Sequence, residues 1–149
     1  MKFLFSRRIL GYGLLALGLI AAYFINVEVQ SYWGRQALAQ AALTNLPLEQ
    51  ALVKAKAESK LVLADVSAIW CPTCRALDKN VFADARVKQK ISEKYIFSRL
   101  EYESQEGADF LAKHEAAGFP NLWLLDGDGK VIRHLTVTLN PTEFLQQLP

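Results

Sequence analysis

Apolar residues are distributed differently in two parts of the chain. Residues 9–25 contain no charged side chain, whereas from residue 47 onward short apolar runs alternate with amphipathic helical patterns. A charge-free run of 17 residues is at the lower limit for a membrane-spanning helix, and Asn26 and Val27 extend it toward the usual ~20 residues. Residues 1–27 are therefore predicted to form a cytoplasmic basic tip and one transmembrane signal anchor.

The charges that flank this apolar run predict its orientation. Lys2, Arg7 and Arg8 precede the run, and Glu28 is the first acidic residue after it. The positive-inside rule then places the N-terminus in the cytoplasm and the rest of the chain outside. A cleaved signal peptide is the alternative, although the small-x-small tripeptide at 37–39 lies far beyond the run for a cleavage site. Both interpretations export the remaining residues.

Residues 47–149 are predicted to form one domain of the α/β class, and residues 28–46 form either a helical stalk or a linker. The order of patterns predicts a mixed sheet with helices on both faces, in which the strand over 61–66 is central and parallel. The predicted elements are a helix from Pro47 toward Ser59, a strand over 61–66, a helix from Pro72 through Lys79, a helix from Asp84 to Lys94, a strand over 95–100, a helix over 106–117, strands over 121–125 and 130–137, and a helix over 143–148.

Turn and cap residues mark several of these boundaries. Asp84 is a predicted N-cap, and Asn140 or Thr142 is predicted to cap the last helix. Gly118 is predicted to end the helix over 106–117 in the C′ position. The Asp-Gly-Asp-Gly run at 126–129 is typical of a hairpin turn, and it lacks the later ligands of a calcium-binding loop.

Net charge adds little to the picture of partners. The chain has 17 basic and 15 acidic residues, a formal charge of +2, and residues 1–34 already account for that excess. Residues 35–149 are formally neutral, so we expect no basic face for nucleic acid.

The two cysteines of the chain, Cys71 and Cys74, lie between the apolar strand and the helix that follows it. Pro72 suits the first helical position, which places Cys71 at or just before the N-cap. The helix dipole would favour its thiolate, and Cys74 would be more enclosed. The spacing therefore predicts an exposed nucleophile and a buried resolving thiol, as thiol–disulfide exchange requires.

Other roles for the two cysteines are less consistent with the sequence. A structural disulfide across two residues would close a very small loop and stabilise the fold little. A metal-holding module would need further ligands, and neither His114 nor His134 has the spacing to supply them. Haem attachment is excluded because Arg75, not histidine, follows Cys74. We therefore expect no metal and no cofactor apart from a redox-active Cys71–Cys74 disulfide.

Asp65 is the one charged residue in the strand over 61–66. A carboxylate near the end of a buried strand is costly unless it has a task. It either caps or pairs locally, or it accepts and returns the proton of Cys74, directly or through one water.

Four features together resemble the thioredoxin-like family. These are Trp70 directly before Cys-x-x-Cys, Asp65 six residues before Cys71, the Gly-Phe-Pro element at 118–120, and the hairpin after it. Within the family, residues 48–148 are most similar to the C-terminal periplasmic domain of the DsbD thiol:disulfide interchange proteins. The resemblance implies a thioredoxin-like fold and a bacterial inner-membrane protein with its C-terminal domain in the periplasm.

The resemblance also implies roles for individual residues. Pro120 is expected to be cis and to pack beside the cysteines, and the backbone of Phe119 to pair with substrate. Asp65 and Asp78 are the acidic residues expected near the site, with Asp78 where the family usually has glutamate. Trp70 would supply an apolar lip or simply pack.

The two residues between the cysteines also affect the expected function. Pro72 and Thr73 replace the glycine and proline of thioredoxin, and they would contact substrate and shift the redox potential.

The expected function is therefore a membrane-anchored protein-disulfide reductase. Its substrate would be an exported or thioredoxin-like protein with a disulfide, and an oxidase or isomerase is the alternative. The multi-span electron-carrying segment of the related proteins is not present in this sequence, and residues 1–27 contain no cysteine. A separate membrane electron donor or acceptor is therefore expected.

Overall fold

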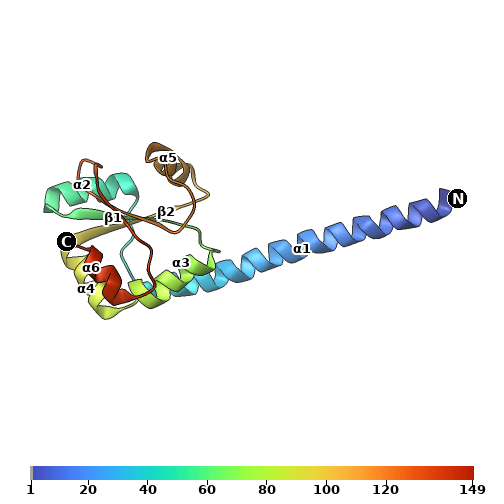
Figure 1. Cartoon of the computed structure of the whole chain (residues 1–149), viewed down its shortest axis with the longest axis horizontal. Helices are drawn as coiled ribbons and strands as arrows, with labels where there is room; N and C mark the ends of the chain where they lie inside the picture. The colour runs from blue at the N-terminus through green and yellow to red at the C-terminus, as the bar shows by residue number, and fades with distance from the viewer. Residues whose placement is uncertain (1) are drawn as a thin grey trace.

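The computed structural model describes the backbone of residues 2–149 and the side chains of residues 11–149. The side chains of Lys2, Arg7 and Arg8, on which the predicted basic tip depends, lie outside the described residues. Helix α1 (Lys2–Ala41) is continuous and projects from the domain formed by the rest of the chain (Figure 1). The helix thus passes through residues 28–41, and an extended segment joins it to the domain.

The domain has four strands with helices on both faces, as the sequence predicts. The strand order is β2-β1-β3-β4, with β1 parallel to β2 and antiparallel to β3, and β3 antiparallel to β4. The central strand β1 is therefore parallel on one side only. The remaining elements are α2 (Leu48–Glu58), β1 (Leu61–Ser67), α3 (Pro72–Leu77), the π-helix η1 (Asp78–Phe82), α4 (Ala85–Lys94), β2 (Tyr95–Glu101), α5 (Gln105–Lys113), β3 (Asn121–Leu125), β4 (Val131–Leu135) and α6 (Pro141–Gln147).

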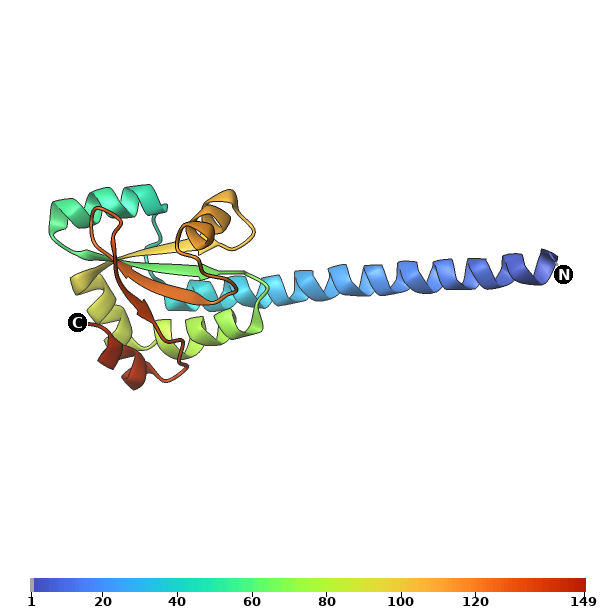
Figure 2. The same ribbon diagram turned by 45° about the horizontal axis from the view of Figure 1, so that its top comes forward.

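Alternation along the strands divides the core into two layers, because successive side chains point to opposite faces of a sheet. Leu63 and Phe97 pack with the end of α1, with η1, and with α4 and α6. Val62 and Leu100 pack on the other face with α2 and α5. Figure 2 shows these two helical layers on either side of the strands. Helix α3, which carries Cys74, begins shortly after the end of the central strand β1.

The predicted end of the helix over 106–117 is wrong. Helix α5 ends at Lys113, and Glu115, with φ of 50°, occupies the left-handed position instead of Gly118. The N–H of Ala116 donates to the carbonyl of Leu111, and Ala116 packs against the core. This Schellman arrangement ends the helix four residues before the predicted end and leaves Gly118 free to begin the next turn.

Other predicted boundaries are confirmed. The side chain of Asp84 accepts hydrogen bonds from two N–H groups of α4, and Asn140, rather than Thr142, caps α6 in the same way. The carboxylate of Asp126 accepts from the N–H groups of Asp128 and Lys130, which fixes the hairpin turn between β3 and β4.

Candidate redox site

The end of β1 delivers the cysteines to the start of α3. Cys71 is the N-cap of this helix, with extended backbone angles, and Pro72 follows at the first helical position. The N–H of Cys74 donates to Sγ of Cys71 over 3.1 Å. A first-turn N–H that points at sulfur stabilises negative charge there, so Cys71 is placed to form the thiolate.

The two cysteines form a disulfide, with Cα atoms 5.3 Å apart. Cys71 is 4% exposed and Cys74 is 2% exposed, so the predicted contrast between an exposed and a buried sulfur is not present in this oxidised form. The physical reason is the packing of aromatic side chains over both. Pro72 and Thr73, between the cysteines, are exposed.

Three aromatic side chains cover the disulfide. Trp70 and Phe119 lie edge to face, with ring centroids 5.3 Å apart. The ring of Phe119 also contacts the ring of Tyr102, with centroids 4.4 Å apart. All three are half-buried and pack against the cluster formed by Ala68 and the cysteines. Trp70 and Phe119 were expected from the sequence. Tyr102 was missed, because it follows the second strand and its spacing in the sequence carries no sign of the contact.

The segment from Gly118 to Asn121 brings Phe119 to the site. The Phe119–Pro120 peptide bond is cis, as the resemblance implies, and Gly118 has φ of 80°. The side chain of Asn121 donates to the carbonyl of Ala117 over 3.3 Å and pairs with Nε2 of His134 over 2.5 Å. These two contacts tie the residue after Pro120 to both flanking segments.

Asp65 does not stand alone in the core. Its Oδ1 accepts from the hydroxyl of Ser67, and its Oδ2 accepts from Nε and Nη2 of Arg99 at 2.8 and 2.6 Å. The same guanidinium donates to both oxygens of Asp78, at 2.5 and 3.0 Å. We call Asp65, Arg99 and Asp78 the buried cluster, since their side chains are 0%, 7% and 3% exposed.

The buried cluster links β1, β2 and the start of η1, which continues the helix that carries the cysteines. Asp65 pairs in register with Arg99, and Asp78 lies one helical turn after Cys74, so it shares that face of the helix. Both acidic residues expected from the resemblance therefore meet at one cation. Arg99 was missed in the sequence, although a lone basic residue in a strand that must lie beside Asp65 was a usable signal.

Burial and charge act in opposite directions on the groups of this cluster. Burial raises the pKa of Asp78 above its ordinary value, and the hydrogen bonds and charge of Arg99 only partly offset that rise. Burial lowers the pKa of Arg99, but the charges of Asp65 and Asp78 and their hydrogen bonds outweigh it and raise the pKa overall. The cluster thus holds a fixed positive charge between two carboxylates.

A further carboxyl group, Glu101, lies at the end of β2. Its Oε1 accepts from the N–H of Ile69 over 3.1 Å, which supports the turn just before Trp70. Burial raises the pKa of Glu101, and the hydrogen bond from Ile69 opposes this rise. This contact could not be predicted from the sequence, because the two residues are 32 positions apart.

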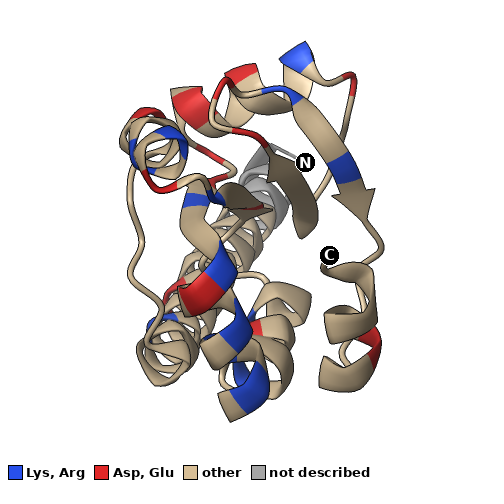
Figure 3. Cartoon of the chain, turned by 90° about the vertical axis from the view of Figure 1, so that its left-hand side faces the viewer, with Lys and Arg blue, Asp and Glu red and all other residues tan. Residues whose placement is uncertain are grey.

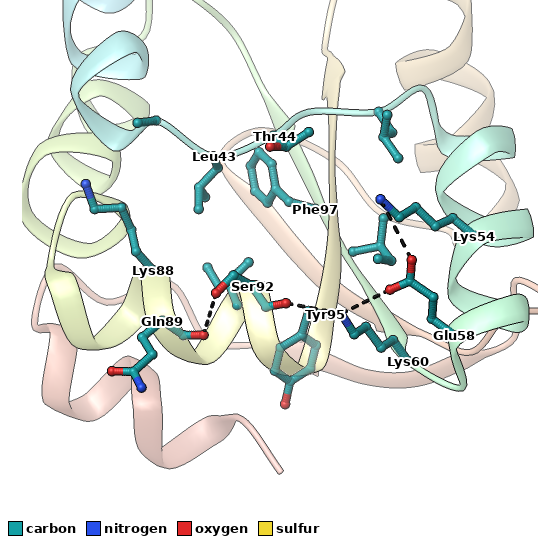
Figure 4. Close-up of a pocket in the computed structure, with 14 residues that line it drawn as sticks. Leu43, Thr44, Lys54, Glu58, Lys60, Lys88, Gln89, Ser92, Tyr95 and Phe97 are labelled. Carbon is teal, nitrogen blue, oxygen red and sulfur yellow. Dashed lines mark hydrogen bonds and ion pairs between the residues drawn. The ribbon is translucent and has the colours of Figure 1, made fainter.

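A cavity of about 370 Å³ lies away from the cysteines, under the segment that joins α1 to α2 (Figure 4). Beside it, Glu58 pairs with Lys60 at 3.0 Å and with Lys54 at 3.9 Å. We call Lys54, Glu58 and Lys60 the surface cluster. Among residues 11–149, no three His, Cys, Asp or Glu side chains gather as metal ligands.

The chain belongs to the thioredoxin-like family, because the family model for the thioredoxin-like domain matches residues 48–149. Members of this family are disulfide oxidoreductases, and the resemblance stated from the residues alone is confirmed.

The curated relatives of this chain include thiol:disulfide interchange proteins. Over 109 residues the chain is 30% identical to the thiol:disulfide interchange protein DsbD of Yersinia pestis. The aligned region covers 71% of this chain and 18% of that protein. The chain thus spans about a fifth of the length of the curated relatives it matches.

Solved structures agree with this placement. A putative disulphide-isomerase from Bacteroides thetaiotaomicron matches with a TM-score of 0.63 and 27% identity, over 72% of this chain and 88% of that one. The oxidised C-terminal domain of DsbD from Neisseria meningitidis has the same fold, with a TM-score of 0.58 and 20% identity, over 70% of this chain and 96% of that one.

Proposed function

We propose that the chain is a membrane-anchored thiol–disulfide oxidoreductase that reduces disulfides of exported proteins in the periplasm of a bacterial cell. The observation that supports this best is the Cys71–Cys74 disulfide at the start of α3, with Trp70, Tyr102 and Phe119 packed against it and a cis bond between Phe119 and Pro120. The similarity to DsbD supports interchange as the reaction, and the apolar helix supports the anchor.

The reaction begins with both cysteines reduced. The thiolate of Cys71 attacks one sulfur of a substrate disulfide, which forms a mixed disulfide and releases one substrate thiolate. Cys74 then loses its proton and attacks Sγ of Cys71, which releases the second substrate thiolate. Two electrons pass to the substrate, and the Cys71–Cys74 disulfide remains.

Side chains around the pair have separate tasks in this proposal. Asp65 takes the proton of Cys74, directly or through one water, and Asp78 adds negative charge on the same side. Trp70 and Phe119 form the apolar surface against which a substrate chain lies, with Pro72 and Thr73 exposed beside them. An Asp65→Asn variant would slow the second step and leave formation of the mixed disulfide unchanged.

Turnover requires a source of electrons, since each cycle leaves the pair oxidised. We propose a separate membrane protein as the donor, because residues 1–27 contain no cysteine and the chain holds one redox pair. The anchor would be the apolar part of α1, which includes a stretch long and apolar enough to cross a membrane within Gly11–Ala41. In this orientation residues 47–149 face the periplasm.

The experiment that tests the function uses the full chain in detergent with insulin as the disulfide substrate. Cys71→Ser is expected to abolish insulin reduction driven by dithiothreitol, and Cys74→Ser is expected to accumulate mixed disulfides that withstand non-reducing electrophoresis. A Cys74→Ser variant that traps no substrate would contradict the assigned roles of the two thiols. A reduction potential well above about −200 mV would assign the chain to oxidation instead of reduction.

A further inference from the structure

The last part of α1 packs on the helix that carries the cysteines. The buried residues of this part are small and share one face: Ser31, Gly34, Ala37 and Ala41. Small side chains allow two helices to approach closely. By contrast, residues 11–26 of the same helix are exposed on every side, including Leu14, Leu17 and Phe24. One rigid element therefore has an unpartnered apolar half and a docked half.

The closest contact of the docked half is with the active-site turn. A Cβ atom added to Gly34 would lie within 3 Å of the carbonyl of Ile69, far closer than real Cβ contacts. Ile69 lies two residues before Cys71, so the helix backbone touches the chain that leads into the redox pair. Glycine is required at this position for that approach.

A second contact holds the other side of the pair. Arg75, directly after Cys74, donates from Nη1 to Oε1 of Gln30 and lies 5.3 Å from the centre of the Trp33 ring. Helix α1 thus contacts the chain both before Cys71 and after Cys74. These contacts fix the direction of the redox pair relative to the axis of α1.

The length of helix between the apolar run and this contact is short. Gly34 lies nine positions after Ile25, which corresponds to about 14 Å at 1.5 Å per residue. Tyr32 and Trp33 are 56% and 49% exposed, and exposed aromatic side chains next to a membrane span lie at the level of the lipid headgroups. Figures 1 and 2 show the turn between β1 and α3 at the edge of the domain from which α1 extends toward the N-terminus.

We propose that residues 30–41 form a rigid strut that holds the Cys71–Cys74 pair toward the membrane, near the headgroups. The redox partner is then an integral membrane protein with a dithiol at that level, which reduces Cys71–Cys74 and becomes a disulfide itself. This inference rests on the proposed function, because it assumes that the pair exchanges disulfides and that the apolar half of α1 is in a bilayer.

The position of the pair can be measured without any activity. A nitroxide label is attached to the full chain at one of two positions, through Thr73→Cys or Asp128→Cys, each in a Cys71→Ser and Cys74→Ser background. The labelled chain is inserted into phosphatidylcholine vesicles that contain nickel-chelating lipid, and nickel at the headgroups relaxes nearby nitroxides. Both residues are exposed. Thr73 lies in α3, which follows the Ser67 end of β1, and Asp128 lies in the turn beside the Leu61 end, so the seven residues of β1, about 23 Å, lie between them. Residue 73 is expected to show several-fold stronger relaxation by nickel, and equal relaxation at the two positions would overturn the proposal.

Two glycine substitutions test whether the strut sets that position. Gly34→Ala places a methyl group against Ile69, whereas Gly18→Ala meets no atom within 4 Å. Gly34→Ala is expected to reduce the relaxation at residue 73, and Gly18→Ala to leave it unchanged. The same relaxation in both variants would mean that the docked contact does not hold the pair.

Insertion variants test the class of partner. Insertion of seven helix-forming residues after Glu28 adds nearly two helical turns to α1. The insertion moves the redox pair about 10 Å further from the membrane and leaves its direction around the helix axis almost unchanged. In cell membranes, the reduced fraction of Cys71–Cys74, measured by thiol alkylation, is expected to fall at least tenfold. Reduction of insulin by the same variant in detergent is expected to stay unchanged.

The outcomes separate this inference from the proposed function. An unchanged reduced fraction in the insertion variant would contradict a partner confined to the membrane surface and favour a soluble one. Absence of insulin reduction by the unmodified chain would instead contradict the proposed function, whatever the nitroxide measurements show.

Discussion

The buried cluster and the surface cluster each contain three charged side chains with opposite ratios of cations to carboxylates, and they differ in exposure to solvent. In the buried cluster one cation, Arg99, binds two carboxylates, whereas in the surface cluster one carboxylate, Glu58, binds two cations. Side-chain exposure is 7% or less in the first and between 25% and 49% in the second. Figure 3, which views the domain from the end opposite the N-terminus, shows charges of both signs spread over its outer elements.

The number of ion pairs in a cluster therefore does not indicate how much the cluster contributes to the free energy of unfolding. Exposed charges are solvated and screened, so losing one partner leaves the other stabilised by water. Buried charges have lost their water, and removing one partner leaves an uncompensated charge in a medium of low dielectric constant. The loss of one partner therefore corresponds to very different free energies in the two clusters.

The largest predicted effect is the loss of Arg99. Arg99→Met leaves Asp65 and Asp78 buried together without a cation, and we expect the free energy of unfolding to fall by about 3–5 kcal/mol. Urea unfolding of the detergent-solubilised chain measures this loss. Arg133→Met is the matched control, because Arg133 is an exposed arginine on β4. A loss no larger than that of the control would show that the buried cluster contributes no more than a surface pair.

A smaller effect is predicted in the pH dependence of stability. Because burial raises the pKa of Asp78, the folded chain binds a proton at this carboxyl more readily than the unfolded chain. The contribution of Asp78 to stability therefore increases as pH falls toward its ordinary pKa of 3.8, and it is lost as pH rises through the raised pKa.

The variant Asp78→Asn isolates this contribution, because it removes the titrating group. Urea unfolding of both proteins from pH 7 to pH 4 should show the unmodified chain gaining stability relative to the variant. The gain corresponds to about 1.4 kcal/mol for each unit by which the pKa is raised. A constant difference between the two proteins over this range would contradict the raised pKa.

The smallest effect is predicted for the surface cluster. Glu58→Gln removes the carboxylate that pairs with Lys54 and Lys60, and we expect a loss below about 1 kcal/mol in urea unfolding. The loss should shrink further in 1 M salt, where the screening length is about 3 Å. A loss that is as large as that of Arg99→Met, or that persists in salt, would remove the contrast between the clusters.

Local signals in the sequence were sufficient for most of the fold. The apolar run at 61–66, the proline at position 72 and the caps at Asp84 and Asn140 act over a few residues, and the structure confirms each of them. The end of α5 was not predictable in this way, because the contact of Ala116 with the core decided it and glycine was not needed.

The candidate site was predicted as far as its residues are neighbours in sequence. The cysteines, the residues between them and Asp65 were singled out from the residues alone, and the resemblance added Asp78, Phe119 and Pro120. Arg99, Glu101 and Tyr102 were missed because they come from the end of β2, and only the pairing of β2 with β1 brings them to the motif. The predicted exposure of Cys71 was wrong for the oxidised form because aromatic packing cannot be read from a spacing.

The charge-free run at the start of α1 also bears on the thickness of the bilayer. With Asn26 and Val27 it has 19 residues, which span about 29 Å, close to the usual hydrocarbon layer of about 30 Å. A span of this length has little to spare for tilt, so the helix stands nearly upright or the bilayer thins slightly around it. In the proposed orientation, the distance between the redox pair and the headgroups then depends on the lipid composition. A thicker membrane shortens the distance from the cysteines to the headgroups, and a thinner membrane lengthens it.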